Sequence, residues 1–223
     1  AKRGIDNSWG VPRGQIYGDF YGRKYVKDAS GVVRKVSEWI VNIFVLNKNA
    51  EIAAREHCDK HVVKMILESA QMLSTAHRML DGTEQTQIRN GRKHRTWVIP
   101  DAREDQMYQA VHMNHPCTIW TRECFSNYKW HFELFESLCQ EYTHRYGKIH
   151  LSQKKLQVPL SRFPDNIPNT PATPFRLAMG SNPECMGPDP IQSYRTFYKT
   201  KQKRFKMVWS KRPTPKWFTN PSE

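Results

Sequence analysis

The sequence lacks the features of a membrane-spanning or secreted protein. No apolar run approaches the ~20 residues that a membrane-spanning helix needs, and the opening residues AKRGIDNSWG lack the apolar stretch of a secretory signal. The five cysteines are an odd number without a Cys-x-x-Cys pair, which favours reduced thiols over a disulfide framework. We therefore expect a cytoplasmic protein without membrane contacts.

The motifs of several enzyme classes are missing as well. The sequence has no GxxxxGK[ST] loop, no GxGxxG after a strand, no HExxH and no GxSxG. Nucleotide hydrolysis, dinucleotide redox chemistry and serine hydrolysis therefore lack support, and we expect no cofactor. Two cysteines and two histidines are nominal zinc ligands, namely Cys58, His61, His115 and Cys117. Their spacing is not that of a zinc finger or ribbon, so we predict no metal site, with a structural zinc as the alternative.

Acidic residues are scarce beside basic ones. Thirty-five lysines and arginines oppose 21 aspartates and glutamates, so the formal net charge is +14. A charge this positive predicts a polyanionic partner, for which we favour nucleic acid, and DNA over RNA. The alternative is a generally basic protein that binds no polyanion specifically.

Hydrophobic periodicity predicts a mainly α fold. A Gly-, Tyr- and base-rich extension (1–40), read as a hairpin or a loose arm, precedes a single helical domain (41–218), whose core (41–150) begins with VNIFVL as a strand or a buried segment. Its helices are predicted over residues 50–80, 102–113 and 116–146. Gly82 would end the first in a left-handed conformation, and Gly147 would end the third. A polar loop with an Asn90-Gly91 turn would join the first two.

Prolines shape the rest of the chain. Eight of them fall between residues 151 and 190, a density that forbids long helices. We predict a mostly extended wrap over the core for residues 151–189. Asp189 and Pro190 then provide an N-cap and a first helical residue, so a basic helix is predicted over 190–210.

The carboxyl-terminal segment has no acidic residue between Pro190 and Pro221, but nine basic ones interleaved with aromatics. Phosphates need cations, and stacking of an exposed base on an aromatic side chain contributes ~1–3 kcal/mol. The alternative is that the aromatics anchor the helix while the cations are solvated. The predicted contacts to nucleic acid are Arg195, Lys199, Lys203 and Arg204.

A line of titratable groups follows one face of the first predicted helix, because residues three or four positions apart share a face. These groups, called the polar ridge below, are His57, His61, Lys64, Glu68 and Gln71. His61 would act as general acid and base, Glu68 as its partner and Lys64 as a phosphate ligand, with Lys60 beside them. The alternative is a solvated helix face held by local ion pairs.

The stretch NHPCTIW suggests a second group of site residues. His115 precedes a proline that begins a helix, where main-chain N–H groups favour anions. His115 would then meet a phosphate or a flipped base, with Arg122 as a clamp. Chemistry on a base in a duplex requires extruding it, and the aromatics predicted to stack against it are Trp120, Tyr128 and Trp130. The alternative makes His115 a capping residue and Trp120 part of the core.

Basic residues also close the third predicted helix. Arg145 and Lys148 would extend the basic surface toward nucleic acid, although cations at a helix carboxyl end are favoured by the helix dipole in any case.

Several stretches together resemble a family of small helical proteins from bacteriophages and bacteria: CDKHVVKMILE, NHPCTIW, EYTHRYGKIH and the closing Pro-Lys-Trp-Phe. The resemblance covers about residues 41–218 and implies a phage-infected or bacterial cell. A fainter one is to the pyrimidine-dimer DNA glycosylases, small helical base-excision enzymes with a lyase activity. Lys60 and Lys64 match their basic pair, whereas His61 stands in place of their catalytic glutamate. Their nucleophile is an amino-terminal amine, which would exist here only in a chain that begins near Val41 or Asn42.

The leading hypothesis is an enzyme that acts on DNA, in base excision, repair or base modification, with His61 as the acid–base group. The competing hypothesis is a non-catalytic nucleic-acid-binding accessory protein, and a third is a nucleotide-modifying enzyme with a closed pocket. The first requires the polar ridge to open onto the same basic surface as the carboxyl-terminal segment.

Overall fold

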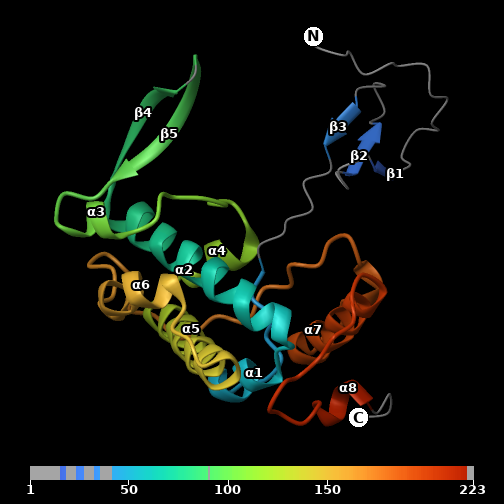
Figure 1. The fold of residues 1–223 in the computed structure, drawn as a ribbon. Helices are drawn as coiled ribbons and strands as arrows, with labels where there is room; N and C mark the ends of the chain where they lie inside the picture. The colour runs from blue at the N-terminus through green and yellow to red at the C-terminus, as the bar shows by residue number, and fades with distance from the viewer. Residues whose placement is uncertain (1–15, 19–23, 28–32, 36–41, 90, 220–223) are drawn as a thin grey trace. The chain divides into compact units, whose positions relative to one another are not determined.

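The computed structural model describes residues 16–18, 24–27, 33–35, 42–89 and 91–219. The chain divides into two compact units, residues 1–40 and 41–223. The second is built mainly from helices, with one two-stranded sheet among its described residues, which confirms the mainly α fold class (Figure 1). No helix in the described ranges is long and apolar enough to cross a membrane.

The first unit contains a small antiparallel sheet. Its strands, with β2 in the middle, are β1 (Ile16–Gly18), β2 (Lys24–Lys27) and β3 (Val33–Lys35). Tyr25 of β2 pairs with Tyr17 on one side and with Lys35 on the other. The part of the extension that can be described is therefore a meander rather than a single hairpin.

The first predicted helix is two helices, α1 (Ala50–Glu56) and α2 (Asp59–Asp81). The prediction of one continuous helix is wrong because the main chain between them bonds to distant side chains. The His57 carbonyl accepts from Arg145 at 2.8 Å, and the Cys58 N–H donates to the Tyr198 hydroxyl at 3.0 Å. These contacts satisfy groups that a continuous helix would have paired internally.

Gly82 does end α2, but not in the predicted left-handed conformation. Its φ of −92° and ψ of 159° are those of extended backbone, which any residue can adopt. Glycine is required there by close packing instead, since a Cβ atom would lie 2.5 Å from the Arg78 carbonyl oxygen and 3.2 Å from that of Val98.

The polar loop predicted after α2 is a β-hairpin that projects from the helical body (Figure 1). Its strands are β4 (Thr83–Arg89) and β5 (Arg92–Val98), paired antiparallel from Thr83↔Val98 to Arg89↔Arg92. Gly91, the described residue of the predicted turn, has a φ of +69°, in the left-handed region. The prediction failed on the strands because they are polar on both faces and show no alternation of apolar residues.

Arg78 holds the chain after the hairpin against α2. Its side chain is fully buried and all five of its N–H groups are bonded. The acceptors are the carbonyl oxygens of Trp97, Glu104, Met107 and Tyr108 and the Glu104 carboxylate. Because carbonyls of this segment point to Arg78, the helix predicted over 102–113 is reduced to α3 (Arg103–Gln106).

The third predicted helix is also divided, into α4 (Pro116–Thr121) and α5 (Phe125–Tyr146). Pro116 occupies the predicted first helical position of α4. Gly147 ends α5 at a φ of +66°, in the left-handed region where a side chain would be strained.

The proline-rich wrap begins later than predicted. Residues Leu151–Ser161 form α6, with Pro159 near its end and with Leu156 and Leu160 fully buried. Burial of this apolar pair outweighs one lost main-chain hydrogen bond. Residues 162–182 contain no helix or strand, as predicted, before a short 3-10 turn, η1 (Pro183–Cys185).

The basic terminal helix is shorter than predicted. Asp189 caps α7 (Pro190–Lys199) by accepting from the Ile191 N–H at 2.8 Å, as the sequence indicated. The chain then tightens into η2 (Thr200–Lys203) and leaves the helical path well before Ser210. One further turn, α8 (Lys216–Thr219), follows.

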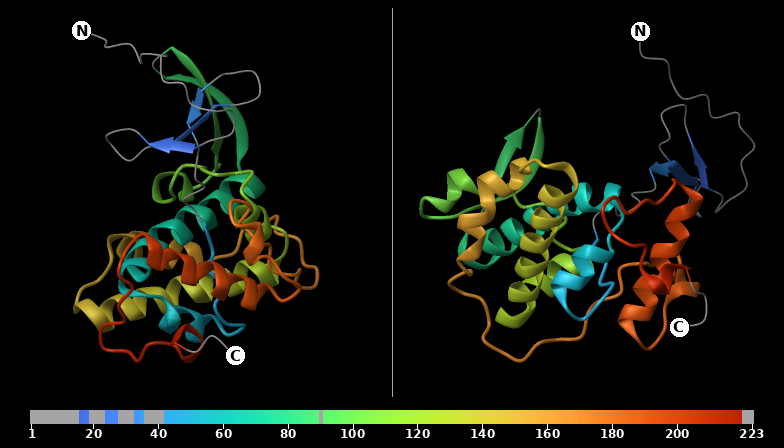
Figure 2. Two further views of the ribbon diagram at one scale, coloured as in Figure 1. Left: turned by 90° about the vertical axis from the view of Figure 1, so that its right-hand side faces the viewer. Right: turned by 60° about the horizontal axis from the view of Figure 1, so that its bottom comes forward.

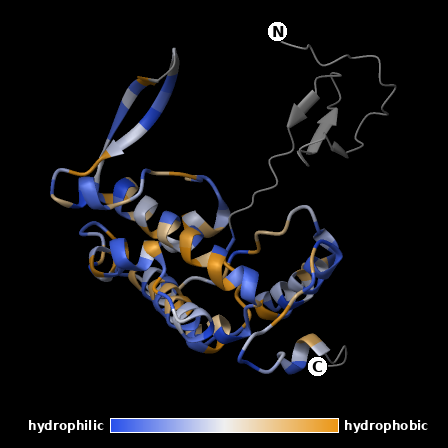
Figure 3. Ribbon diagram, viewed as in Figure 1, coloured by the Kyte–Doolittle hydropathy of each residue, from blue (hydrophilic) through white to orange (hydrophobic). Residues whose placement is uncertain are grey.

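The core of the second unit lies between α2 and α5, which pack along each other (Figure 2). Apolar residues concentrate where these helices face their neighbours, and polar ones cover the outside (Figure 3). The segment VNIFVL was predicted as a strand or a buried segment, and its described part, residues 42–46, is a buried segment without strand pairing. This segment brings Asn42 beside the middle of α2.

Candidate functional site

The most unusual polar contact in the core joins the buried segment to α2. The main-chain nitrogen of Asn42 donates to Glu68 Oε2 at 3.1 Å, and Lys64 Nζ lies 3.1 Å from Glu68 Oε1. Glu68 is only 4% exposed. Its burial raises the pKa of the carboxyl group, and the charge of Lys64 opposes part of that rise.

The side chain of Asn42 holds the main-chain nitrogen of the same residue in place. Asn42 Nδ2 donates to the Ala178 carbonyl at 2.9 Å, and the Cys117 thiol lies 3.5 Å from Asn42 Oδ1. Burial raises the pKa of Cys117 to about 11, so the thiol is protonated at neutral pH. Asn42, Glu68, Lys64 and Cys117 are called the Glu68 cluster below.

A hollow lies directly beside the Glu68 cluster. It is too narrow to admit a water molecule. Its lining residues are Ile43, Val45, Cys117, Trp120, Phe175, Arg176 and Tyr194. Entry of a nucleotide would therefore require the lining to open, and Arg176 is its exposed member.

The other half of the polar ridge is packed with aromatic rings. The His61 imidazole stacks on Phe44, with ring centres 5.0 Å apart, and meets Tyr198 and Phe205 at 4.9 and 5.4 Å. Burial lowers the pKa of His61 to about 3, with smaller effects from nearby cations. A general base at neutral pH needs a pKa near 7 and access to its substrate. In this conformation His61 has neither.

His57 is placed in a similar way. Its side chain is fully buried, its Nδ1 lies 2.6 Å from the Ala53 carbonyl oxygen, and burial lowers its pKa to about 4. The polar ridge is therefore buried at His57, His61 and Glu68, and exposed at Lys64.

The carboxyl-terminal segment lies beside the start of α2, but the polar ridge does not open onto it as the leading hypothesis required. The Asp59 N–H donates to the Val208 carbonyl at 2.8 Å, and Lys60 Nζ lies 4.9 Å from the centre of the Phe205 ring. Lys201 Nζ lies 3.7 Å from the centre of the Phe197 ring. The two regions meet, but aromatic side chains fill the space between them.

The predicted cations differ in accessibility. Lys60, Lys148, Lys203 and Arg204 are exposed, whereas Lys199 and Arg122 are half-buried. Arg195 points inward, with its Nε donating to the Leu46 carbonyl at 2.8 Å and its guanidinium over Trp217. Arg122 has a buried Nη1 without a hydrogen-bond partner, and its burial lowers its pKa.

Arg145 is a structural residue rather than a surface cation. Its fully buried guanidinium bonds to the Arg55 and His57 carbonyls and pairs with Asp59 and Glu141. The prediction that it contacts nucleic acid is corrected by this burial, since every direction in which it could donate is already occupied by the protein. Lys148, three residues on, remains exposed.

His115 is the N-cap of α4. It is 1% exposed, and its Nδ1 accepts from the Cys117 N–H at 3.2 Å, so it competes for the N–H groups that an anion would use. Trp120 and Tyr128 are buried, which places them in the core instead of on a stacking surface. Trp130 is half-buried, with its Nε1 donating to the Lys48 carbonyl at 2.6 Å.

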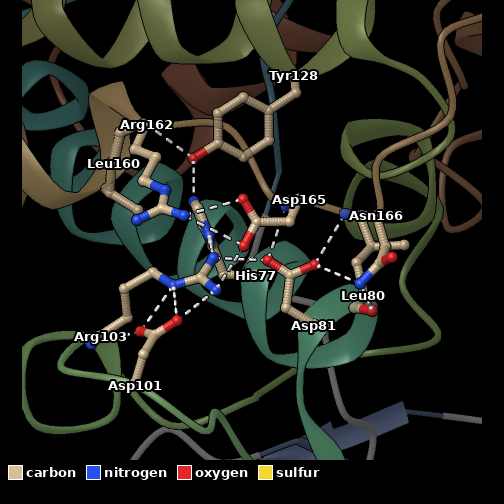
Figure 4. A network of polar contacts seen from close by, with 10 residues as sticks. All are labelled: His77, Leu80, Asp81, Asp101, Arg103, Tyr128, Leu160, Arg162, Asp165 and Asn166. Atoms are coloured by element: carbon tan, nitrogen blue, oxygen red, sulfur yellow. Dashed lines mark hydrogen bonds and ion pairs between the residues drawn. The ribbon is translucent and has the colours of Figure 1, made fainter.

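A second polar cluster lies at the far end of α2 (Figure 4). Arg103 pairs with Asp81, Asp101 and Asp165 and lies 3.1 Å from His77 Nδ1, while His77 Nε2 meets the Tyr128 hydroxyl at 2.8 Å. Burial lowers the pKa of His77 to about 4. Both ring nitrogens of His77 are bonded, so this cluster joins α2, α3 and α5 and offers no free group for chemistry.

Among the residues that the structure describes, no group of three or more His, Cys, Asp or Glu side chains is arranged to hold a metal ion. The sequence named Asn42 only as a possible chain start, and its contact with Glu68 was not predicted because that contact depends on how a short apolar segment enters the core. The sequence did contain a signal, since the polar Asn42 directly precedes the apolar residues 43–46.

Comparison with known proteins gave no match to a family model, to a curated protein or to a solved structure.

Proposed function

We propose that this protein is a DNA-acting enzyme of the base-excision type, and that Glu68, rather than His61, is its acid–base group. The observation that carries the proposal is the Glu68 carboxylate 3.1 Å from the Asn42 main-chain nitrogen, deep in the core and beside a lysine. Burying an ionisable group is costly, and such groups are concentrated at functional sites.

The shifted pKa supports this role. A carboxyl group with a raised pKa keeps a proton closer to neutral pH and can both accept and return it during a reaction. Lys64, on the next turn of α2, is partly exposed and supplies positive charge at the same carboxylate.

The chemistry that fits this pair is amine catalysis. In the 223-residue chain the Asn42 nitrogen is a peptide nitrogen, whose lone pair is delocalised and not nucleophilic. A chain that begins at Asn42 would carry a primary amine there. The nitrogen would bond to C1′ of the target nucleotide as the glycosidic bond breaks, and the base would leave with the electron pair of that bond and take up a proton from water. Glu68 would take the proton from the amine and return it to the sugar ring oxygen as the ring opens to an iminium.

The decisive experiment compares the full chain with a chain that starts at Asn42, released from a cleavable fusion. Each chain is mixed with single-stranded DNA that contains an abasic site, and borohydride is added to reduce any iminium adduct between the two. We expect the shorter chain to form a covalent adduct that peptide mass spectrometry places on the Asn42 nitrogen. Glu68→Gln should lower its yield at least ~100-fold, the usual range for a lost acid–base group. The exposed Glu133→Gln variant is the control.

An adduct on Lys64 would identify a different nucleophile in the same cluster. If neither chain forms an adduct or releases a base from damaged, modified or plain DNA, but both bind DNA tightly, the accessory-protein hypothesis replaces this proposal. The hollow near Asn42, which is too narrow to admit a water molecule, is the feature that favours that second hypothesis.

A further inference from the structure

The β4–β5 hairpin contributes little to the core. Its buried residues, Thr96 and Trp97, lie near its base, whereas side chains along both strands are exposed, Ile88 by 74%. An isolated two-stranded hairpin is at most marginally stable in water. This one is held at its base by Arg78, which donates to the Trp97 carbonyl at 2.7 Å, and by the close approach of Gly82 to Val98.

The dimensions of the hairpin fit a groove of duplex DNA. Each strand has seven residues, which at ~3.3 Å per residue gives an arm of ~23 Å. The major groove of B-DNA, about 12 Å wide, admits a two-stranded ribbon. The arm projects away from the helices (Figure 1), so its outer part is free of the rest of its own unit.

The charge of the hairpin suits a polyanion. Residues 83–98 contain four lysines and arginines and a single acid, Glu84. The acid is paired with Arg95, whose guanidinium also lies 5.1 Å from the centre of the Trp97 ring. Lys93 and His94 are exposed beside it. The net charge of the arm is therefore positive.

The two faces of the hairpin carry different chemistry. Cross-strand partners share a face, so the register places Arg95 with Thr86 and Lys93 with Ile88 on one side. The other side carries the pairs Gln87–His94, Gln85–Thr96 and, nearest the turn, Arg89–Arg92, and of these Thr96 is buried at the base of the hairpin. Amide and hydroxyl groups can bond to base edges, while lysine and arginine bond both to phosphates and to the O6 and N7 atoms of guanine.

We propose that the β4–β5 hairpin is a DNA-binding arm that enters the major groove of a B-form duplex, with the face that carries Gln85, Gln87 and His94 toward the base edges. The inference shares with the proposed function only the choice of DNA as partner. A-form RNA has a deep, narrow major groove that such an arm cannot enter, so duplex RNA provides a natural contrast.

The test measures binding of the full chain to an undamaged DNA duplex. The variant Lys93→Ala/Arg95→Ala is compared with Lys129→Ala/Lys154→Ala, which removes the same charge from exposed positions on α5 and α6. Removing two cations that each neutralise a phosphate should weaken binding about 100-fold at ~0.1 M salt and reduce the salt slope by about 1.8. We expect this weakening for the hairpin variant but not for the variant on α5 and α6. We expect it with duplex DNA but not with duplex RNA.

Dimethyl sulfate probing supplies a second readout, because it methylates guanine N7 in the major groove. The full chain should protect guanines from methylation, and the hairpin variant should not. Lys93→Glu is a further variant that leaves the Arg95–Trp97 packing intact, and thermal unfolding checks that each variant is folded. Equal weakening by the two double variants, equal weakening with duplex RNA, or unprotected guanines would overturn the inference. The adduct assay with single-stranded abasic DNA reports on the proposed function independently of all three outcomes.

Discussion

Asn42 and Glu68 lie 26 positions apart in the sequence, yet the main-chain nitrogen of one donates to the carboxylate of the other at 3.1 Å. The contact exists because the segment 42–46 runs buried beside α2 and delivers its first described residue to the middle of that helix. A buried carboxylate held in this way has consequences for stability as well as for chemistry.

Replacing Glu68 by Gln should stabilise the protein at neutral pH. Burial raises the pKa of Glu68 above 4.5, so the folded protein holds the charged form at a cost that grows as the pH rises above that value. The cost is absent at lower pH, where the carboxyl group is protonated in both states. Glutamine keeps an acceptor for the Asn42 N–H. We expect a higher Tm than wild type at about pH 7.5 and no difference near pH 4, measured by calorimetry.

A lower Tm for Glu68→Gln at the higher pH would mean that the Lys64 ion pair outweighs desolvation. Glu133→Gln, on the exposed side of α5, should leave Tm unchanged at both pH values.

Three fully buried histidines should make the protein acid-sensitive. Burial lowers the pKa of His57 and His77 to about 4 and that of His131 to about 3, against 6.5 in the unfolded chain. The unfolded state therefore binds protons first, and stability is lost as the pH falls from about 6.5 toward the folded values. Each histidine contributes ~1.4 kcal/mol per pH unit in that window. Urea denaturation at about pH 7, 6 and 5 should show that the free energy of unfolding falls steeply with pH.

The contribution of one histidine to the pH dependence of the free energy of unfolding can be measured separately. His131→Asn should reduce that dependence by ~1.4 kcal/mol per pH unit, whereas the exposed His144→Gln should not change it. A free energy of unfolding that is constant between neutral pH and about pH 5 would contradict the prediction.

Substitution of Arg145 should destabilise the protein strongly, whereas substitution of Lys148 should have little effect. Arg145→Met removes the buried cation of Asp59 and one of the two cations that pair with Glu141, the other being Arg212, and should cost about 3–5 kcal/mol of stability. Lys148→Ala should cost less than ~0.5 kcal/mol, as exposed substitutions usually do. Chemical denaturation of both variants measures the difference, and a small effect for Arg145→Met would show that its buried ion pairs do not hold the fold together.

Gly82→Ala should loosen the base of the hairpin. A Cβ atom there would meet the Arg78 and Val98 carbonyl oxygens, and overpacking of this kind costs about 1–3 kcal/mol. Gly180→Ala, where a Cβ would meet nothing within 4 Å, is the matched control. Hydrogen exchange of the β4 and β5 amides should be faster in Gly82→Ala alone. Unchanged exchange would show that the backbone relieves the contact by a small shift.

Local capping chemistry made part of the fold predictable from sequence. The first-position proline of α4, the glycine stop at Gly147 and the Asp189–Pro190 start of α7 depend on residues next to one another, and all three are confirmed. The breaks in the long helices were not predictable in this way. The break at His57–Cys58 depends on Arg145 and Tyr198, which lie 88 and 140 positions away.

The candidate site was predicted only in outline. Helical spacing correctly placed His61, Lys64 and Glu68 on one face of α2, but spacing does not determine what covers that face. Phe44 and Tyr198 cover His61, while Asn42 reaches Glu68, and both arrangements depend on segments distant in sequence. The difference between an accessible acid–base histidine and a buried one is therefore set by tertiary packing.

The length of α2 adds a geometric consequence. Its 23 residues span ~35 Å, and one turn of B-DNA is about 34–36 Å. Lys60 stands at its first turn and the hairpin leaves from its last. Under the proposal that the β4–β5 hairpin binds duplex DNA, Lys60 and the base of the hairpin are separated by about the length of one turn of that duplex.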